Sequence, residues 1–271
     1  MSAQHSTTIV VPCYNEAQRL ATDQFRRFAL THPSIRFLFV NDGSRDQTLE
    51  LLRGLGEADP EHFQWLDLPQ NQGKAEAVRN GMLQALASDS VYAGYWDADL
   101  ATPLEEIPRF VAALEPGRDM CFGSRVRLLG RAIERKPVRH YLGRMFATAA
   151  SFLLDLPVYD TQCGAKLFRV NDDARALFAD PFSVNWTFDV EIIARLQAHL
   201  TGIPSAGDAS TRIYELPLNE WRDVAGSKVR PTDFLKGLLE LWRIYRRYGY
   251  GGRRPQAVSS AAAAAVRVSK P

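Results

Sequence analysis

The first hundred residues alternate between short β-rich runs and helical patterns, and this alternation constrains the fold more than any other feature. Runs rich in Val, Ile and aromatic residues predict strands, and apolar residues spaced three and four apart predict helices between them. Strands that alternate with helices imply an α/β protein with a mostly parallel central sheet flanked by helices. The predicted strands are 7–13, 35–41, 63–68 and 91–97, and the predicted helices are 17–30, 46–55 and 74–87.

Polar segments follow each of these four predicted strands. In a parallel α/β sheet, ligands bind beyond the carboxyl ends of the strands, where the four segments would meet at one edge. Each segment alone has a structural explanation as a helix cap or a turn. Four of them at successive strand ends favour a ligand site. The segments are Pro12 to Glu16, Asn41 to Ser44, Asn71 to Lys74 and Asp97 to Asp99.

Two carboxylates one residue apart end the fourth predicted strand. Asp97 and Asp99 follow the apolar run 91–96, and a strand interior cannot hold two ionised carboxylates without partners. If the strand continued through both residues, their side chains would point to the same side and could bind one divalent cation. The structural alternative is an acidic turn before a helix that starts near Pro103, with Thr102 as its N-cap.

Several function classes are excluded by what the sequence lacks. No Gly-x-Gly-x-x-Gly follows the first predicted strand, and Gly73-Lys74 has no upstream glycine at P-loop spacing. This argues against a dinucleotide oxidoreductase and a P-loop NTPase. A net charge of +2 gives no global field for capturing nucleic acid, so we expect no nucleic-acid partner. A nucleotide site here would use the Asp42 carboxylate, amides and a metal.

Length and composition bound the organisation of the chain. Its 271 residues, 46% hydrophobic and 24% charged, predict one domain over 1–250, followed by a disordered tail over 251–271 rich in Gly, Ala, Ser and basic residues. Three widely spaced cysteines fit the reducing cytosol. A polar N-terminus and the lack of a long apolar run argue against a signal peptide and a spanning segment. We expect a cytoplasmic protein, with peripheral attachment to the cytoplasmic membrane left open.

The second half of the chain is less regular. A strand is predicted at 120–123, followed by a basic connection over 124–140 that suits an anionic ligand, anionic lipid heads or a solvated loop. Helices are predicted over 141–154 and 233–248. The second is basic and amphipathic, and we favour packing against the sheet over attachment to a membrane. Its predicted apolar side consists of Phe234, Leu238, Leu241, Trp242 and Tyr245.

Two further segments carry candidate site residues. Asp189 and Glu191 lie too close along a predicted helix to share a face, so at most one points into a site, and we favour Asp189. After a predicted strand at 212–216, a polar loop brings the cations Arg222 and Lys228.

Eight motifs in this order resemble the family 2 inverting glycosyltransferases, which have the GT-A fold. The resemblance spans residues 7–248 and is greatest to the polyprenyl-phosphate hexosyltransferases, the branch of the dolichyl-phosphate glucosyl- and mannosyltransferases. Segments 186–189 and 221–228 look more like the glucosyl enzymes. The motifs are Val-Pro-Cys-Tyr-Asn-Glu (11–16), Val-Asn-Asp-Gly-Ser (40–44), Asn-Gln-Gly-Lys-Ala (71–75), Asp-Ala-Asp (97–99), Gly-Ser-Arg (123–125), Gln-Cys-Gly-Ala-Lys-Leu-Phe (162–168), Trp-Thr-Phe-Asp-Val-Glu (186–191) and Gly-Ser-Lys (226–228).

This resemblance implies a nucleotide-sugar donor, with UDP-glucose expected, and Mg²⁺ or Mn²⁺ as cofactor. Asp99 and Asp97 would contact the metal and border the diphosphate, and Asp42 would accept a hydrogen bond from the uracil edge. Lys74 would lie near the base or ribose. The full implied donor site is Pro12, Tyr14, Glu16, Asp42, Lys74, Asp97, Arg222 and Lys228, the last two as phosphate clamps.

The acceptor determines whether a general base is needed. The resemblance implies a polyprenyl phosphate, whose oxygen is already anionic. A hydroxyl acceptor would need a base, and Asp189 is the candidate. The basic connection would receive the acceptor phosphate. The predicted acceptor-site residues are Arg125, Arg135, Arg139 and Gln162.

Four other functions stay open at this point. A GDP-mannose-dependent polyprenyl-phosphate mannosyltransferase and a family 2 transferase to a hydroxyl acceptor share the motifs. A nucleotidyltransferase would also use paired carboxylates and a metal, but it usually has a Gly-rich basic loop where this chain has Pro-Cys-Tyr-Asn-Glu. An inactive nucleotide-binding protein is the last alternative, and the intact residues Asp97, Asp99, Asp189 and Lys228 argue against it.

Overall fold

The central sheet of the computed structural model has seven strands in the order β3-β2-β1-β4-β7-β5-β8. The structure describes residues 6–114, 117–134, 137–202, 208–224 and 231–252. Among them, β7 alone runs antiparallel to its neighbours, and a second small sheet pairs β6 with β9. The strands are β1 (Thr7–Cys13), β2 (Ile35–Asp42), β3 (Phe63–Leu68), β4 (Tyr92–Trp96), β5 (Met120–Ser124), β6 (Ala132–Glu134), β7 (Ala165–Arg169), β8 (Ile213–Pro217) and β9 (Glu220–Arg222).

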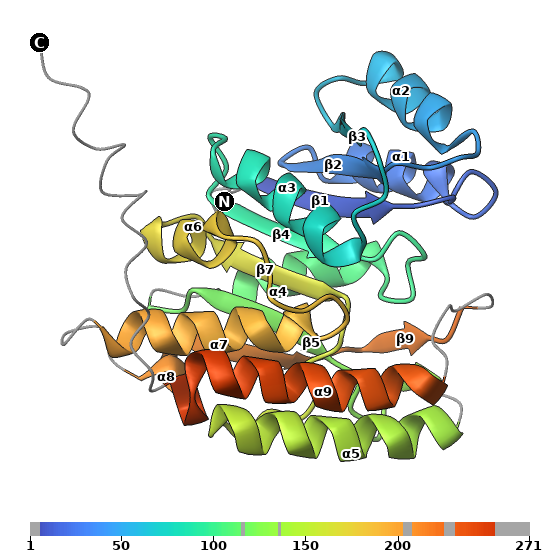
Figure 1. The fold of residues 1–271 in the computed structure, drawn as a ribbon. Coiled ribbons are helices and arrows are strands. Elements are labelled where there is room, and N and C mark those ends of the chain that lie inside the picture. Colours follow the sequence, from blue (N-terminus) through green and yellow to red (C-terminus); the bar gives the residue numbers. More distant parts are fainter. Residues whose placement is uncertain (1–5, 115–116, 135–136, 203–207, 225–230, 253–271) are drawn as a thin grey trace, which may run out of the picture.

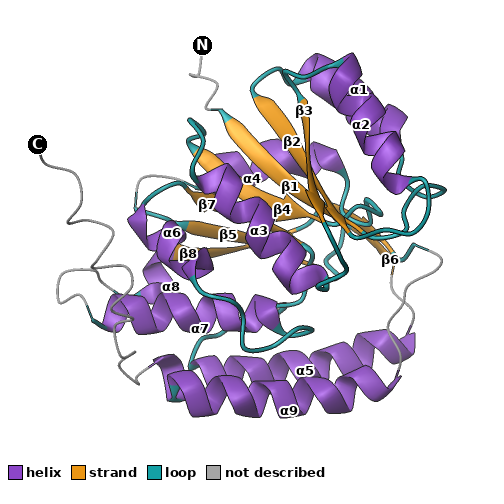
Figure 2. Ribbon diagram, turned by 45° about the horizontal axis from the view of Figure 1, so that its top comes forward, coloured by secondary structure: helices purple, strands orange, loops and turns teal. Residues whose placement is uncertain are grey.

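Helices cover both faces of this sheet (Figures 1 and 2). Alternation along β1 sends Val10 to one buried apolar cluster and Ile9 and Val11 to the other. Helices α1, α2 and α4 pack on the second face, and α3, α5, α6, α7 and α9 on the first. The helices are α1 (Thr22–Thr31), α2 (Thr48–Ala58), α3 (Lys74–Leu86), α4 (Ile107–Ala113), α5 (Pro137–Leu154), α6 (Asp172–Ala179), α7 (Phe188–Thr201), α8 (Ala209–Arg212) and α9 (Pro231–Tyr248), with 3₁₀ turns η1 (Leu104–Glu106) and η2 (Tyr250–Gly252).

The predicted α/β class and the mostly parallel sheet are confirmed. The fourth strand, however, ends at Trp96, so the two-residue period of a strand does not orient Asp97 and Asp99. Thr102 is not a helix cap, because η1 begins at Leu104 with Pro103 as its N-cap. Instead, the Thr102 carbonyl accepts a hydrogen bond from the Trp96 indole at 2.8 Å.

The basic connection over 124–140 is more ordered than expected. It contains β6, and α5 begins within it at Pro137, a residue type whose fixed φ suits the first turn of a helix. The predicted tail over 251–271 lies outside the described residues, except that 251 and 252 belong to η2. The domain boundary at 250 therefore stays a prediction. Of the helices that the structure describes, none has the length and apolarity needed to cross a bilayer.

Helix α9 buries only part of the predicted apolar side, Leu241, together with residues next to it. Leu241, Ile244 and Tyr248 are buried, whereas Leu238 and Trp242 are about half exposed, at 50% and 56%. Together with α5, α9 forms an outer layer that packs against α7 (Figure 2). The helix thus packs toward the sheet as predicted, but through an adjacent stripe.

Candidate active site

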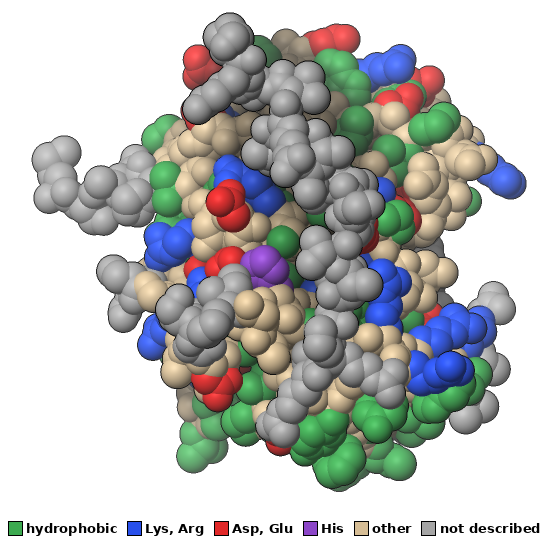
Figure 3. All heavy atoms as spheres, turned by 60° about the vertical axis from the view of Figure 1, so that its left-hand side comes forward, with side chains coloured by type: hydrophobic (Ala, Val, Ile, Leu, Met, Phe, Trp, Pro, Cys, Tyr) green, Lys and Arg blue, Asp and Glu red, His purple; other side chains and the backbone are tan. Residues whose placement is uncertain are grey.

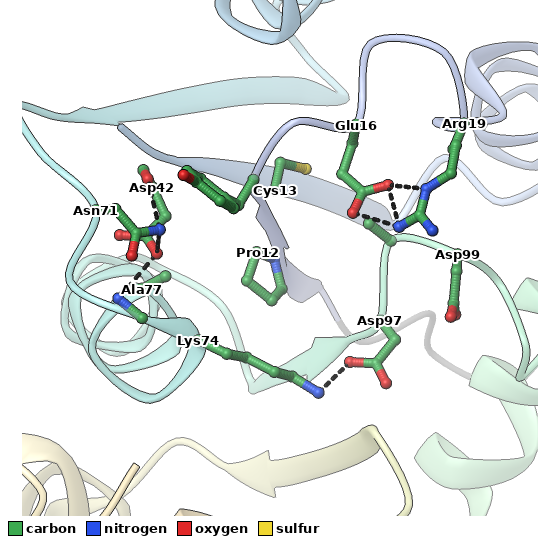
Figure 4. A pocket seen from close by; sticks show the side chains of 13 residues that line it. Pro12, Cys13, Glu16, Arg19, Asp42, Asn71, Lys74, Ala77, Asp97 and Asp99 are labelled. Carbon is green, nitrogen blue, oxygen red and sulfur yellow. Dashed lines mark hydrogen bonds and ion pairs between the residues drawn. The ribbon is translucent and has the colours of Figure 1, made fainter. Parts of the chain in front are cut away.

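A cavity of about 400 Å³ lies at the carboxyl ends of β1, β2 and β4 (Figure 4). The four polar segments singled out in the sequence all contribute to it, as the parallel topology requires. We call it the first cavity. Its lining consists of Pro12, Cys13, Tyr14, Glu16, Arg19, Asp42, Asn71, Gly73, Lys74, Ala77, Asp97, Ala98 and Asp99.

Asp42 holds the loop that closes one side of the first cavity. Its carboxylate accepts hydrogen bonds from the Asn71 side chain at 2.8 Å and from the backbone N–H groups of Gln72 and Gly73 at 2.7 and 2.9 Å. Burial raises the pKa of Asp42, and the two backbone donors oppose that rise. Contact with a uracil edge stays a prediction, whereas the loop contacts explain why an acid stands at this strand end.

Glu16 also has a partner within the protein. It is buried, and Arg19 donates to both of its oxygens at 2.7 and 2.8 Å (Figure 4). The negative charge of Glu16 in the wall of the first cavity is therefore balanced by the guanidinium of Arg19.

Lys74 and Asp97 form an ion pair in the wall of the first cavity. The Lys74 Nζ lies 2.5 Å from Asp97 Oδ1 (Figure 4). Burial lowers the pKa of Lys74, but the carboxylates of Asp97 and Asp189 outweigh this effect, and the pKa is raised overall. The lysine therefore stays cationic, beside the position where an anionic ligand would meet the carboxylates.

Asp99 is exposed at the mouth of the cavity, and the backbone N–H of Ala101 donates to its Oδ1 at 3.1 Å. Partial desolvation raises the pKa of Asp99, and the negative charge of Asp97 raises it further. Two carboxylates that repel each other favour a divalent cation between them.

The donor set of this pair fits Mg²⁺ or Mn²⁺. Within the described part of the chain, no group of three or more His, Cys, Asp or Glu side chains could hold a metal ion. Mg²⁺ is commonly bound by one or two carboxylates together with substrate phosphates and water. Asp97 and Asp99 match that pattern, with a diphosphate supplying the remaining ligands.

A second cavity, of about 460 Å³, adjoins the first and shares Lys74, Asp97 and Asp99 with it. Aromatic and apolar side chains form much of its wall, including Phe146 and Trp186. Its polar lining residues include Arg125, Arg144, Asp160, Thr161, Gln162, Asn185, Asp189 and Asp223. The carboxylate pair therefore stands where the two cavities meet.

Asp189 belongs to a buried network in the wall of the second cavity. Its Oδ1 accepts hydrogen bonds from the Tyr95 hydroxyl and from the Lys166 ammonium, both at 2.5 Å. Lys166 is fully buried and also donates to the carbonyls of Thr161 and Cys163. Asp189, the residue favoured over Glu191 from the sequence, lines the second cavity, and Glu191 does not. Glu191 instead bonds to Arg195 at 2.9 Å.

The predicted acceptor residues are only partly brought together. Arg125 lines the second cavity, but its guanidinium is bidentate to Asp160 at 2.6 and 2.7 Å. Gln162 also lines it, and its Nε2 is buried without a hydrogen-bond partner among the residues that the structure describes. Arg135 lies outside the described residues, as does the side chain of Arg139, a residue of α5.

The predicted phosphate clamps are not placed in the site. Arg222 lies on β9, where it pairs with Glu220 at 2.9 Å, and it lines neither cavity. Lys228 lies outside the described residues.

Two cations at the second cavity had not been predicted: Arg144, which lines it, and Lys166, which is buried behind Asp189. Lys166 lies among the buried residues of strand β7, between Ala165 and Leu167, and a charge within a buried strand was the available signal. Arg144 lies in α5, where its guanidinium stacks 3.6 Å from the Tyr159 ring centroid and donates to the Tyr159 carbonyl. Nothing in its spacing distinguishes it from a surface arginine.

The sheet order and the carboxylate pair at the end of β4 define a nucleotide-sugar transferase of the GT-A type, and solved structures support this fold. Glucosyl-3-phosphoglycerate synthase from Mycobacterium tuberculosis, solved with UDP, matches with a TM-score of 0.60 at 17% identity, covering 89% of this chain and 80% of that one. Mannosyl-3-phosphoglycerate synthase from Rubrobacter xylanophilus matches with a TM-score of 0.61 at 15% identity, covering 95% and 80%.

Sequence comparison identifies the family. Residues 8–175 match the model of glycosyl transferase family 2, and the chain belongs to this family. A dolichyl-phosphate beta-glucosyltransferase of Drosophila melanogaster is 31% identical over 91% of this chain and 76% of its own length. One from Trichomonas vaginalis is 30% identical over 88% and 70%, and the human enzyme is 29% identical over 83% and 69%.

Proposed function

We propose that this glycosyltransferase moves glucose from UDP-glucose to a polyprenyl phosphate, with inversion and with Mg²⁺ or Mn²⁺ as cofactor. The observation that carries the proposal is the position of Asp97 and Asp99 in the walls of two adjoining cavities. The first would hold the nucleotide and the second the acceptor, so the sugar would lie between them. The beta-glucosyltransferase relatives named for dolichyl phosphate support this choice of acceptor.

In the first cavity, the loop held by Asp42 would enclose the nucleoside, and Asp97 and Asp99 would hold the cation. A divalent cation bound there would neutralise charge on the departing diphosphate. Lys74 adds a fixed positive charge at the same end of the cavity. Its ion pair with Asp97 orients both side chains before the donor arrives.

The second cavity offers what a lipid phosphate would need. Phe146 and Trp186 supply apolar surface for the first part of a polyprenyl chain. The unpartnered Nε2 of Gln162 and the guanidinium of Arg144 supply donors for phosphate oxygens. A phosphate oxygen is already anionic, so the attack on the anomeric carbon would require no general base.

A soluble hydroxyl acceptor is the second candidate, and the position of Asp189 favours it. This carboxylate lines the second cavity, where it could accept the proton of an attacking hydroxyl group. In that case Lys166 and Tyr95 would orient the base through its Oδ1.

The reaction would take place at the cytoplasmic surface of a membrane. The three cysteines, Cys13, Cys121 and Cys163, are buried and unpaired, which fits a reducing compartment.

The test is a donor and acceptor panel. UDP-glucose and GDP-mannose are each incubated with Mn²⁺ and either a short polyprenyl phosphate or 3-phosphoglycerate, and glycosylated products are measured by mass spectrometry. We expect glucosyl polyprenyl phosphate with UDP-glucose, no product from Asp99→Asn, and normal product from the exposed control Asp172→Asn. Transfer of mannose, or transfer to 3-phosphoglycerate alone, would refute the proposal.

A further inference from the structure

Helices α5 and α9 expose an unusual amount of apolar surface for a folded chain. Fourteen large hydrophobic residues are exposed among those that the structure describes, and eight of them lie on α5, α9 and η2. Residues separated by three, four or seven positions share a helix face. Most of the eight residues therefore form two stripes, one on α5 and one on α9. The eight are Tyr141, Met145, Phe152, Leu238, Leu239, Trp242, Tyr245 and Tyr250. We call them the α5–α9 surface.

The two helices lie side by side at one edge of the molecule (Figures 1 and 2). In the space-filling view, hydrophobic side chains gather along the same lower edge, with Lys and Arg side chains beside them (Figure 3). Phe152 packs against Tyr250 at a centroid distance of 5.6 Å, which links α5 to the end of α9. The α5–α9 surface is therefore one continuous patch.

The charges around this patch are mostly positive, although the exposed Asp155 lies beside it and accepts a hydrogen bond from the Tyr250 hydroxyl at 2.9 Å. Lys236, Arg243, Arg246 and Arg247 are exposed on α9, and α5 contains no acidic residue. Glu240 faces inward, where it accepts hydrogen bonds from the backbone N–H groups of Trp186 and Thr187. Exposed aromatic residues combined with Lys and Arg are the composition of helices that lie in a membrane interface.

Helix α5 contributes both to the second cavity and to the α5–α9 surface. Gly143, Arg144, Phe146 and Ala147 line the cavity, and Met145, on the other side of the same turn, is 71% exposed. The width of one helix therefore separates the cavity from the patch at this point.

We infer that the α5–α9 surface docks the enzyme in plane on a bilayer containing anionic phospholipids, with the aromatic side chains at the level of the headgroups. The purpose of this docking rests on the proposed lipid acceptor, which would then enter the second cavity from the bilayer. A second copy of the chain fits the patch less well, because a two-fold interface would bring the same cations together. Each exposed cation adds attraction to an anionic surface.

Vesicle co-sedimentation tests the inference on the full chain without any substrate. Binding to phosphatidylcholine vesicles is compared with binding to vesicles that also contain phosphatidylglycerol, at low and high salt. We expect strong binding only with the anionic lipid, weakened by salt. The triple variant Arg243→Gln/Arg246→Gln/Arg247→Gln should lower the vesicle partition coefficient about a hundredfold, because each cation contributes a factor of roughly five.

A second variant separates the apolar contribution. Leu239→Glu/Trp242→Glu should abolish vesicle binding, while Leu30→Glu, a matched change at an exposed leucine of α1 (81% exposed), should leave it unchanged. Equal thermal melts of the three proteins show that each is folded. Binding that neither variant affects, or no binding to anionic vesicles, would overturn the inference. So would a dimer in light scattering that Leu239→Glu/Trp242→Glu dissociates.

The outcome is independent of the transfer reaction. A chain that binds vesicles through this surface but glycosylates no polyprenyl phosphate would refute the proposed acceptor and leave the docking surface standing. A chain that glycosylates a short soluble polyprenyl phosphate but does not bind vesicles would refute the docking surface and leave the proposed acceptor standing.

Discussion

The carboxylate of Asp97 lies directly against the α-carbon of Gly164. The backbone N–H of Asp97 donates to the Gly164 carbonyl at 3.0 Å, and a Cβ added at Gly164 would lie 1.8 Å from Asp97 Oδ2. The start of β7 therefore fixes the position of the acid that both cavities share.

Gly164→Ala should weaken donor binding. The new methyl group must displace the Asp97 side chain and break its ion pair with Lys74. We expect Mn²⁺-dependent binding of UDP-glucose to weaken at least tenfold in calorimetry. Gly54→Ala on α2 is the matched control, since its Cβ meets nothing within 4 Å, and it should gain up to about 1 kcal/mol of stability. Unchanged donor affinity in Gly164→Ala would refute this role.

Lys166→Met should destabilise the fold by about 3–5 kcal/mol, because it leaves the buried Asp189 carboxylate without its counter-charge. Urea unfolding at pH 7 measures this loss. Lys166→Met/Asp189→Asn should recover part of it, since no buried charge then stands alone. If the two single losses simply add in the double variant, the two side chains are not coupled.

Asp189→Asn should distinguish the two proposed acceptors. The asparagine oxygen can still accept hydrogen bonds from Tyr95 and Lys166, but the buried Lys166 ammonium loses its counter-charge, so we expect lower stability, with normal donor affinity at temperatures where the variant is folded. With a lipid phosphate as acceptor, we expect kcat to fall less than tenfold. A loss of about 10²–10⁴ in kcat is expected if Asp189 acts as the general base, and that result in single-turnover kinetics would favour the hydroxyl acceptor.

Glu240→Gln should weaken acceptor use without affecting the donor. The Glu240 carboxylate accepts from the backbone of Trp186 and Thr187 at 3.0 and 2.8 Å and from the Thr187 hydroxyl at 2.9 Å. These bonds hold the segment that leads into Asp189 and lines the second cavity. We expect acceptor KM to rise about tenfold, with a stability loss of roughly 1–3 kcal/mol.

The control for this variant is Glu57→Gln on the exposed side of α2. It should change neither KM nor stability. An equal rise in donor and acceptor KM for Glu240→Gln would indicate a general loss of structure instead of a local one.

Asp99→Asn should make the metal-free protein more stable at neutral pH. Desolvation and the charge of Asp97 raise the pKa of Asp99, so its ionisation costs folding free energy. This cost is absent below the ordinary pKa of an aspartate and complete above the raised value. Because Asp99 is exposed and solvent screens the repulsion, we expect a small rise in Tm at pH 7 and no difference at low pH. A lower Tm at pH 7 would contradict the repulsion between the two carboxylates.

Much of the first cavity could be predicted from the sequence because its determinants are local. Each strand of the first half ends in a polar segment, and parallel topology alone brings such segments to one edge. Residues such as Pro12, Asp42 and Lys74 therefore line the cavity as expected. The expected phosphate clamp Arg222 does not, because β9 turns it toward Glu220. That pairing depends on a small second sheet, which no periodicity predicted.

The sequence by itself determined the α/β architecture, the family motifs and the carboxylate pair, since all three depend on spacing within short segments. Only the tertiary structure decided which charges are paired inside the protein and which face a ligand. Lys166 meets Asp189 across 23 residues, and Glu240 reaches Thr187 across 53. It also decided which stripe of α9 is buried. A helical period shows that a helix has apolar faces, but the elements packed against it select the face that is covered and leave the other exposed to solvent or to a bilayer.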